Sequence, residues 1–87
     1  ASADFRVIPN PFDDFICIET GRIYPDPVSL RIFDGRGMLV HSAVIPAGGH
    51  LYRWNCNIDS NSRIAKGIFI IQLSSPYSQA TRVVLRK

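Results

Sequence analysis

The sequence is poor in cysteine and has no long apolar run. Its 87 residues include only Cys17 and Cys56, too few for a disulfide-held miniprotein and too few to ligate a metal ion. The sequence leaves open whether the two thiols are bridged, because a bridge requires Cα atoms within about 7 Å. No apolar stretch approaches the roughly 20 residues of a membrane-spanning helix. These absences favour a small domain held together by an apolar core.

The sequence also shows neither the basic pattern of a nucleic-acid-binding surface nor the pattern of a signal peptide. The net charge is only +3, and the ten Lys and Arg residues are dense only at Arg82, Arg86 and Lys87. Because no basic stripe with interleaved aromatic residues exists, we expect no nucleic-acid partner. The chain opens with Ala-Ser-Ala-Asp, which lacks the basic start and apolar run of a signal peptide. We therefore expect an artificial start or a cut inside a longer protein.

No pattern of catalytic residues is present. His41 and His50 lie nine residues apart, and nothing in the sequence draws them toward an Asp or Ser partner. We expect two surface or edge histidines. The polar run at 55–62 contains no glycine-rich phosphate cradle and no nucleophile motif, so it is predicted to be an exposed loop. The sequence predicts neither an enzyme nor a cofactor.

A calcium site is the first of two weaker binding hypotheses. Clustered carboxylates attract hard cations, and Asp13-Asp14 could meet Asp26 or Asp34 in space. The spacing of an EF-hand loop is absent, and a turn already explains Asp34. We predict no metal site.

A sugar-binding platform is the second. Trp54, Tyr24, Tyr52 and Tyr77 could form an aromatic surface for a carbohydrate. Trp54 is the largest piece of apolar surface in the chain, and a buried aromatic is typical of the core of a thin β-sandwich. We therefore expect Trp54 in the core and keep a small carbohydrate-binding module as an alternative.

The clearest structural signal is a β-hairpin between Val28 and Ser42. Val28, Leu30 and Ile32 alternate with polar residues, which is the period of a strand with one buried face. Asp34-Gly35 and Gly37 follow, and such residues tolerate the positive φ of a tight hairpin turn. An apolar run from Met38 to Val40 then starts the second strand.

The rest of the chain repeats short strand-like segments separated by turn residues. Glycine and proline mark turns at 21–27, 46–49 and 74–78. No segment has a helical period. The expected strands are 5–8, 15–20, 28–33, 38–42, 50–54, 67–73 and 79–86, with 67–73 central. About seven short antiparallel strands with frequent turns predict an all-β, immunoglobulin-like sandwich.

The segment Pro9-Asn10-Pro11-Phe12 interrupts the first strand. Two prolines fix φ and remove backbone donors, so the chain must form a rigid corner before the next strand begins. Phe12 is expected to plug the edge of the core at this corner.

The order of these signals resembles a known family. The Pro9–Phe12 corner comes first, VSLRIFDGRGMLV at 28–40 stands in the middle, and GIFIIQL at 67–73 precedes the final RVVLRK. This order is similar to the type A C-terminal sorting domain of the type IX (Por) secretion system on Bacteroidetes secreted proteins. LYRW at 51–54 and AKGIF at 65–69 also resemble the immunoglobulin-like module of flagellar hook-capping proteins. The resemblance covers about Val7 to Lys87.

Three positions depart from the family pattern. Phe69 stands where Tyr is commoner, Asn55 replaces an Asp, and Cys56 falls where a Gly is usual. These departures weaken the match of one loop and leave the strand plan intact.

The resemblance implies an address label for an N-terminal cargo. Residues 1–87 would form a single sorting domain, with 1–6 as a linker or lead-in to the first strand. The cargo would cross the periplasm, pass the type IX translocon and reach the cell surface or medium. A sortase-like protease usually cuts such domains off, here just upstream of Val7. The expected recognition residues are Pro9, Asn10, Pro11, Phe12, Gly67, Val83, Val84, Leu85, Arg86 and Lys87.

Several other readings remain at this point. The corner could be only a strand restart, and the basic chain end only a solvated terminus. A free terminal strand could instead pair with the transporter by strand addition and leave its basic end for an acidic partner. The domain could also be a structural immunoglobulin-like spacer or adhesion module. A weak dimer through free edge strands is left open.

Overall fold

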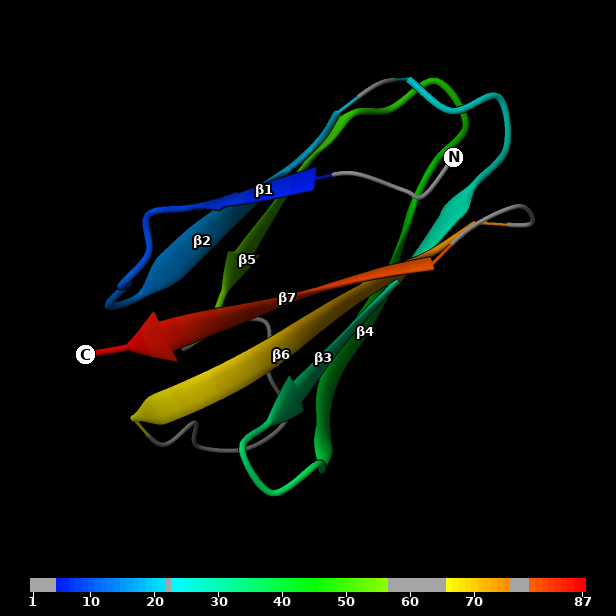
Figure 1. The fold of residues 1–87 in the computed structure, drawn as a ribbon. Helices are drawn as coiled ribbons and strands as arrows, with labels where there is room; N and C mark the ends of the chain where they lie inside the picture. The colour runs from blue at the N-terminus through cyan, green and yellow to red at the C-terminus, as the bar shows by residue number, and fades with distance from the viewer. Residues whose placement is uncertain (1–4, 22, 57–65, 76–78) are drawn as a thin grey trace.

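Seven strands form the chain in the computed structural model, which describes residues 5–21, 23–56, 66–75 and 79–87. Their order along the chain is visible in Figure 1. They are β1 (Phe5–Ile8), β2 (Phe15–Thr20), β3 (Val28–Asp34), β4 (Leu39–Ile45), β5 (Leu51–Asn55), β6 (Gly67–Ser74) and β7 (Gln79–Arg86). Within these ranges no helix is long and apolar enough to cross a membrane.

The strands pack as two antiparallel sheets. One sheet has the order β1-β2-β5 and the other the order β4-β3-β6-β7, and the two layers lie apart in Figure 1. In a constant-type immunoglobulin domain the fourth strand joins the first sheet, whereas here β4 pairs with β3. The prediction of an all-β sandwich of about seven strands is confirmed, and β6 is central as expected.

The core lies between the sheets and follows the alternation of each strand. Ile16 and Ile18 of β2 are fully buried, as are Leu30 and Ile32 of β3. Trp54 is 0% exposed, which places it in the core as predicted. The other buried apolar residues are Phe5, Phe12, Tyr24, Val28, Ile45, Cys56, Phe69, Ile71, Leu73 and Val84. One continuous core therefore joins all seven strands.

The predicted hairpin forms between β3 and β4, but its turn differs in detail. The positive φ belongs to Gly37, at 87°, and no described residue other than glycine has one. The Gly37 N–H donates to the Asp34 carbonyl at 2.9 Å, and the Asp34 N–H donates to the Met38 carbonyl at 2.9 Å. A three-residue loop with glycine in the left-handed position thus closes the hairpin.

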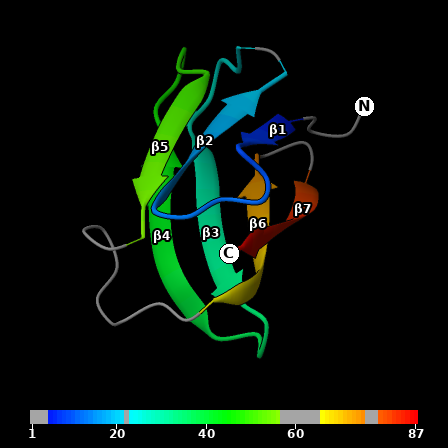
Figure 2. The same cartoon turned by 90° about the vertical axis from the view of Figure 1, so that its left-hand side faces the viewer.

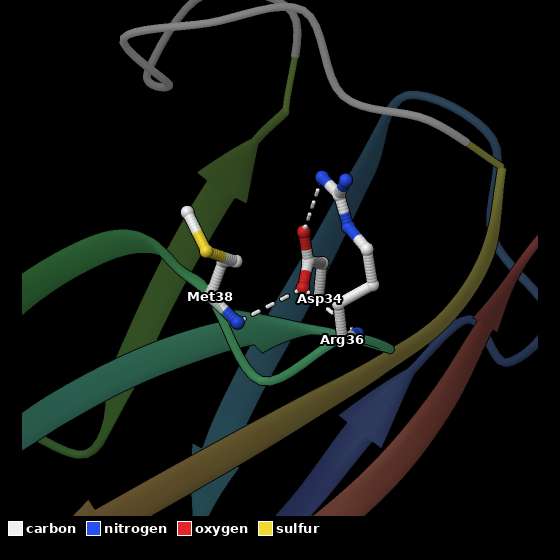
Figure 3. A network of polar contacts seen from close by, with 3 residues as sticks. All are labelled: Asp34, Arg36 and Met38. Atoms are coloured by element: carbon white, nitrogen blue, oxygen red, sulfur yellow. Dashed lines mark hydrogen bonds and ion pairs between the residues drawn. The ribbon is translucent and has the colours of Figure 1, made fainter.

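The Asp34 carboxylate holds this loop together, as Figure 3 shows. Its Oδ1 accepts hydrogen bonds from the N–H groups of Arg36 at 2.9 Å and Met38 at 3.0 Å. Its Oδ2 lies 3.3 Å from the Arg36 guanidinium. The Met38 N–H bond is the largest cause of a pKa below the ordinary value for Asp34. Both carboxylate oxygens of Asp34 therefore stabilise the turn.

We expect the Asp34→Ala variant to melt at a lower temperature than the wild type at pH 7. A carboxyl whose folded pKa is lowered stabilises the fold above its unfolded pKa, and this contribution is lost as the pH falls through the folded pKa. The difference in melting temperature should therefore shrink below about pH 4. Circular dichroism melts of both proteins from pH 7 to pH 2.5 measure this difference. A difference that stays constant over this range contradicts the assignment.

The start of β4 differs from the predicted apolar strand. The strand begins at Leu39, so Met38 lies outside it, and their side chains are 53% and 60% exposed. The register between β3 and β4 shifts at Ile32 and Phe33, and Leu39 consequently faces outward opposite Phe33. Because β4 is an edge strand, its N-terminal part buries little apolar surface.

His41 lies on an edge strand as expected, but its ring is not a surface group. The imidazole stacks on the Trp54 indole with ring centroids 6.0 Å apart, and its Nε2 lies 2.8 Å from the Tyr52 hydroxyl. These contacts join β4 of one sheet to β5 of the other. His50 is exposed, and its carbonyl accepts a bond from the Thr20 N–H.

The two cysteines are both free thiols in the structure. Cys17 is half-buried, whereas Cys56 is 1% exposed and its thiol donates to the Asp14 carbonyl at 3.2 Å. Burial raises the pKa of the Cys56 thiol. The predicted exposed loop at 55–62 is wrong at its start, because Asn55 ends β5 and Cys56 is in the core. Residues 57–62 lie outside the described residues, as do residues 76–78 of the predicted turn at 74–78.

Candidate functional site

The predicted corner and the end of β7 come together in space. The Phe12 N–H donates to the Leu85 carbonyl at 2.8 Å, and the Lys87 N–H donates to the Phe12 carbonyl at 2.8 Å. These bonds form a parallel bridge between Phe12 and Arg86. The chain end lies beside the connection from β1 to β2 in both Figure 1 and Figure 2. The chain thus leaves one sheet at β1 and contacts the other sheet at Phe12.

Side chains reinforce this junction. The Asn10 Oδ1 accepts a hydrogen bond from the Leu85 N–H at 3.0 Å, and the Arg86 Nε donates to the Asp13 carbonyl at 2.8 Å. The Phe12 ring, only 1% exposed, packs about 6 Å from the rings of Trp54 and Phe69. Phe12 plugs the core as predicted, and it fixes the corner to the rest of the molecule.

Burial divides the ten predicted recognition residues into three groups. Phe12 and Val84 are buried and can only shape the site, while Gly67 and Arg86 are half-buried. A partner can reach the exposed members, which are Pro9, Asn10, Pro11, Val83, Leu85 and Lys87. A shallow pocket beside the corner is lined by Pro9, Pro11, Phe12, Asp13, Asp14, Phe15 and Lys87.

Gly67 occupies a position that requires glycine. It begins β6 opposite Arg86 with φ at 120°, a conformation that side-chain-bearing residues rarely adopt. A Cβ at this position would meet nothing within 4 Å. The backbone conformation, rather than close packing, therefore explains the glycine.

The outer edge of β7 is only partly covered. Because the N–H and C=O groups of Leu85 point to the corner, those of Val83, Thr81 and Gln79 point to the same side, away from β6. No strand among the described residues pairs with them. The Arg82 guanidinium folds back on the Thr81 carbonyl at 3.0 Å. An open strand edge thus ends at the corner, as the reading of a free terminal strand requires.

A groove runs beside this open edge. It lies between the edge strands of the two sheets and is lined by Phe5, Arg6, Val7, Ile8, Asn10, Arg82, Val83 and Val84. The Arg82 guanidinium lies 5.2 Å from the centre of the Phe5 ring. The groove presents both apolar side chains and backbone groups of β7, which are the two features an added strand uses.

The weaker binding hypotheses gain no support. Trp54 and Tyr24 are buried and cannot face a sugar, and Tyr52 is held against His41. Tyr77 lies outside the described residues. Across the described ranges, no three His, Cys, Asp or Glu side chains gather in a group that could hold a metal ion.

Comparison with known proteins shows the family of the chain. No curated protein matches it. The family of secretion system C-terminal sorting domains matches residues 6–86, which is nearly the whole chain. The chain therefore belongs to this family, the signals by which the type IX (Por) secretion system exports an N-terminal cargo to the cell surface or medium.

Proposed function

We propose that the type IX machinery reads this signal by adding a strand to the outer edge of β7. The observation that carries the proposal is the open edge: the outward backbone groups of Gln79, Thr81 and Val83 have no strand partner among the described residues. Strand addition gains affinity from main-chain bonds and specificity from side-chain pockets. The groove between β1 and β7 offers such pockets.

The corner would set where the added strand ends. Asn10 and Phe12 already occupy the outward backbone groups of Leu85 and part of those of Lys87. A partner strand must therefore stop near Val83. Pro9 and Pro11 expose their rings beside this point, and the half-buried Arg86 and exposed Lys87 suit an acidic residue on the partner.

The export route and the removal of the domain form the second part of the proposal. The domain folds as one unit in the periplasm, type A in its family, and acts as a signal without enzymatic activity. A sortase-like surface protease then separates it from the cargo, with the cut upstream of Val7. Phe5 is 2% exposed and paired with Thr20, so a protease acting on the folded domain must cut before Phe5.

The Thr81→Pro variant tests the edge. Proline removes the outward N–H of Thr81 but no bond to β6, and edge strands tolerate it at such positions. We expect a signal-peptide-bearing fluorescent protein fused to the variant domain to stay in the periplasm of a type IX host. Cell-surface and medium fluorescence, compared with periplasmic fluorescence, measures the export.

Thr81→Ala is the matched control, because it shortens the same side chain and keeps the N–H. We expect the control to be exported like the wild type. Circular dichroism melts of the purified domains verify that both variants are folded. If a folded Thr81→Pro domain is exported at the wild-type level, the strand-addition proposal is wrong.

A further inference from the structure

We propose that the outer face of the four-stranded sheet is a second recognition surface, and that it binds an apolar protein surface bordered by carboxylates. The inference rests on one part of the proposed function, that a protein partner reads the folded domain, and it does not require strand addition. The second surface is formed by side chains on a face of the sheet, whereas strand addition uses backbone groups at the edge of β7. We call this surface the apolar band, formed by Phe33, Leu39, Ile68, Ile70, Val83 and Leu85.

The strand register places these six residues side by side. Phe33 of β3 lies opposite Leu39 of β4 and also opposite Ile70 of β6. Ile70 in turn lies opposite Val83 of β7. Directly opposite residues share a face of the sheet, so these four residues form one row across all four strands. Ile68 opposite Leu85 begins the adjacent row.

The remainder of the same face is polar apart from Val44. The next row across the sheet consists of Ser42, Arg31, Gln72 and Thr81. The last row consists of Val44, Ser29, Ser74 and Gln79. Apolar residues thus occupy all six places at one end of the face and a single place at the other. This separation of apolar from polar residues on one face of the sheet requires an explanation.

Solvent exposure shows that no part of the described chain covers the band. Leu39 is 53% exposed, Ile68 54%, Val83 58% and Leu85 46%, while Phe33 and Ile70 are half-buried by their neighbours. The solvated face of an antiparallel sheet is ordinarily polar. A contiguous exposed apolar patch of this kind marks an interaction surface.

The charges around the band point to an acidic partner. Arg31 stands in the row on one side, and a pocket on the other side brings Arg36 and Lys66 against Ile68. The described rows of this face contain no carboxylate, and Asp34 at the band's end is paired with Arg36. Cations therefore border the band on two sides. A second copy of the chain would bring like charges together, which disfavours a dimer through this face.

Substitution of Leu39 separates the band from the β7 edge. Leu39 is on β4, at the opposite edge of the sheet from β7. We expect export of the fluorescent fusion to fall about tenfold in the double variant Leu39→Ser/Ile68→Ser, because two exposed apolar contacts are lost. The melting temperature should stay near that of the wild type, since both side chains are largely solvated.

Val44→Ser is the matched control. Val44 is 58% exposed, as Val83 is, and lies on the same face in the polar row. We expect its export to equal that of the wild type. A charge test accompanies it: Lys66→Glu should reduce export, whereas Arg31→Gln, which removes one bordering cation without reversing its charge, should reduce it less. Equal export of the double variant and Val44→Ser overturns the inference.

The outcomes distinguish this inference from the edge proposal. Retention of Thr81→Pro with normal export of Leu39→Ser/Ile68→Ser supports the edge and overturns the band. The reverse pattern supports the band and overturns the edge. Sedimentation of the purified domain as a dimer that Leu39→Ser/Ile68→Ser abolishes would assign the band to a second copy and overturn the inference. Band-dependent flotation with phosphatidylethanolamine–phosphatidylglycerol vesicles would overturn it in favour of a lipid surface.

Discussion

The Phe12→Ala variant is expected to lose a large share of the stability of the domain. Phe12 is 1% exposed and contacts the rings of both Trp54 and Phe69. Truncation of a buried Phe to Ala costs about 3–5 kcal/mol, against a total of about 5–15 kcal/mol for a native domain. Alanine keeps the two backbone bonds that Phe12 makes to β7, but it loses the buried ring that fixes the corner against the core.

Circular dichroism melts and urea titrations measure this loss. For a chain of this size we expect the melting temperature to fall by roughly 12 °C or more. Phe15→Ala is the matched control: Phe15 lies three residues further on but is half-buried, with the Arg53 guanidinium 4.1 Å above its ring. The control should lose about 1 kcal/mol. Equal melting temperatures for the two variants would contradict the role given to Phe12.

The strands could be predicted because their burial follows local alternation. Val28, Leu30 and Ile32 read as one buried face in the sequence and form one in the structure. The same holds for Ile16 and Ile18. A period-two pattern specifies which face of a strand is buried, so it is sufficient where one face meets the core.

Edge strands and contacts between sheets could not be predicted in this way. Met38 and Leu39 are apolar but exposed, because β4 lies at an edge and its register shifts beside Phe33. His41 was expected to be a surface or edge residue, yet it stacks on Trp54. That contact depends on β4 and β5 lying on the same side of the sandwich. Local periodicity carries no information about such a relation.

The candidate site was predicted in part. The family resemblance named the Pro9–Phe12 corner and the end of β7 together, but the residues themselves gave no reason for their pairing. The structure supplies one in the bond from the Leu85 N–H to Asn10, which are 75 positions apart. The open edge at Thr81 depends on which backbone groups face outward, and this follows only once one bonded pair fixes the alternation.

Deletion of Val83 to Lys87 is expected to unfold the domain. Val84 is 2% exposed, so its loss removes about 1.5–3 kcal/mol of apolar burial. The four bonds of Leu85, Arg86 and Lys87 to the corner are lost as well, each worth about 0.5–1.5 kcal/mol. The deletion also removes the part of β7 that pairs with Gly67 to Ile70. The total of about 4–9 kcal/mol is comparable to the whole stability of a small domain.

Unfolding changes what such a deletion can prove. Export of the truncated fusion should fail, but it should fail because no folded signal remains. We expect the circular dichroism spectrum of the truncated domain to lose its β-sheet signature and its cooperative melt. Deletion of Lys87 alone is the control, because it keeps Val84 and loses one backbone bond to Phe12. That domain should melt cooperatively at a slightly lower temperature.

Comparison of the deletion with Thr81→Pro then separates recognition from folding. Both variants should be retained in the periplasm, but only Thr81→Pro should be retained in a folded state. If the truncated domain keeps a cooperative melt and is still retained, the lost residues themselves contact the machinery. Recognition would then lie among the deleted residues Val83 to Lys87, at the end of β7. The chain end is needed for the domain to fold. Any recognition by these residues therefore depends on their structural role.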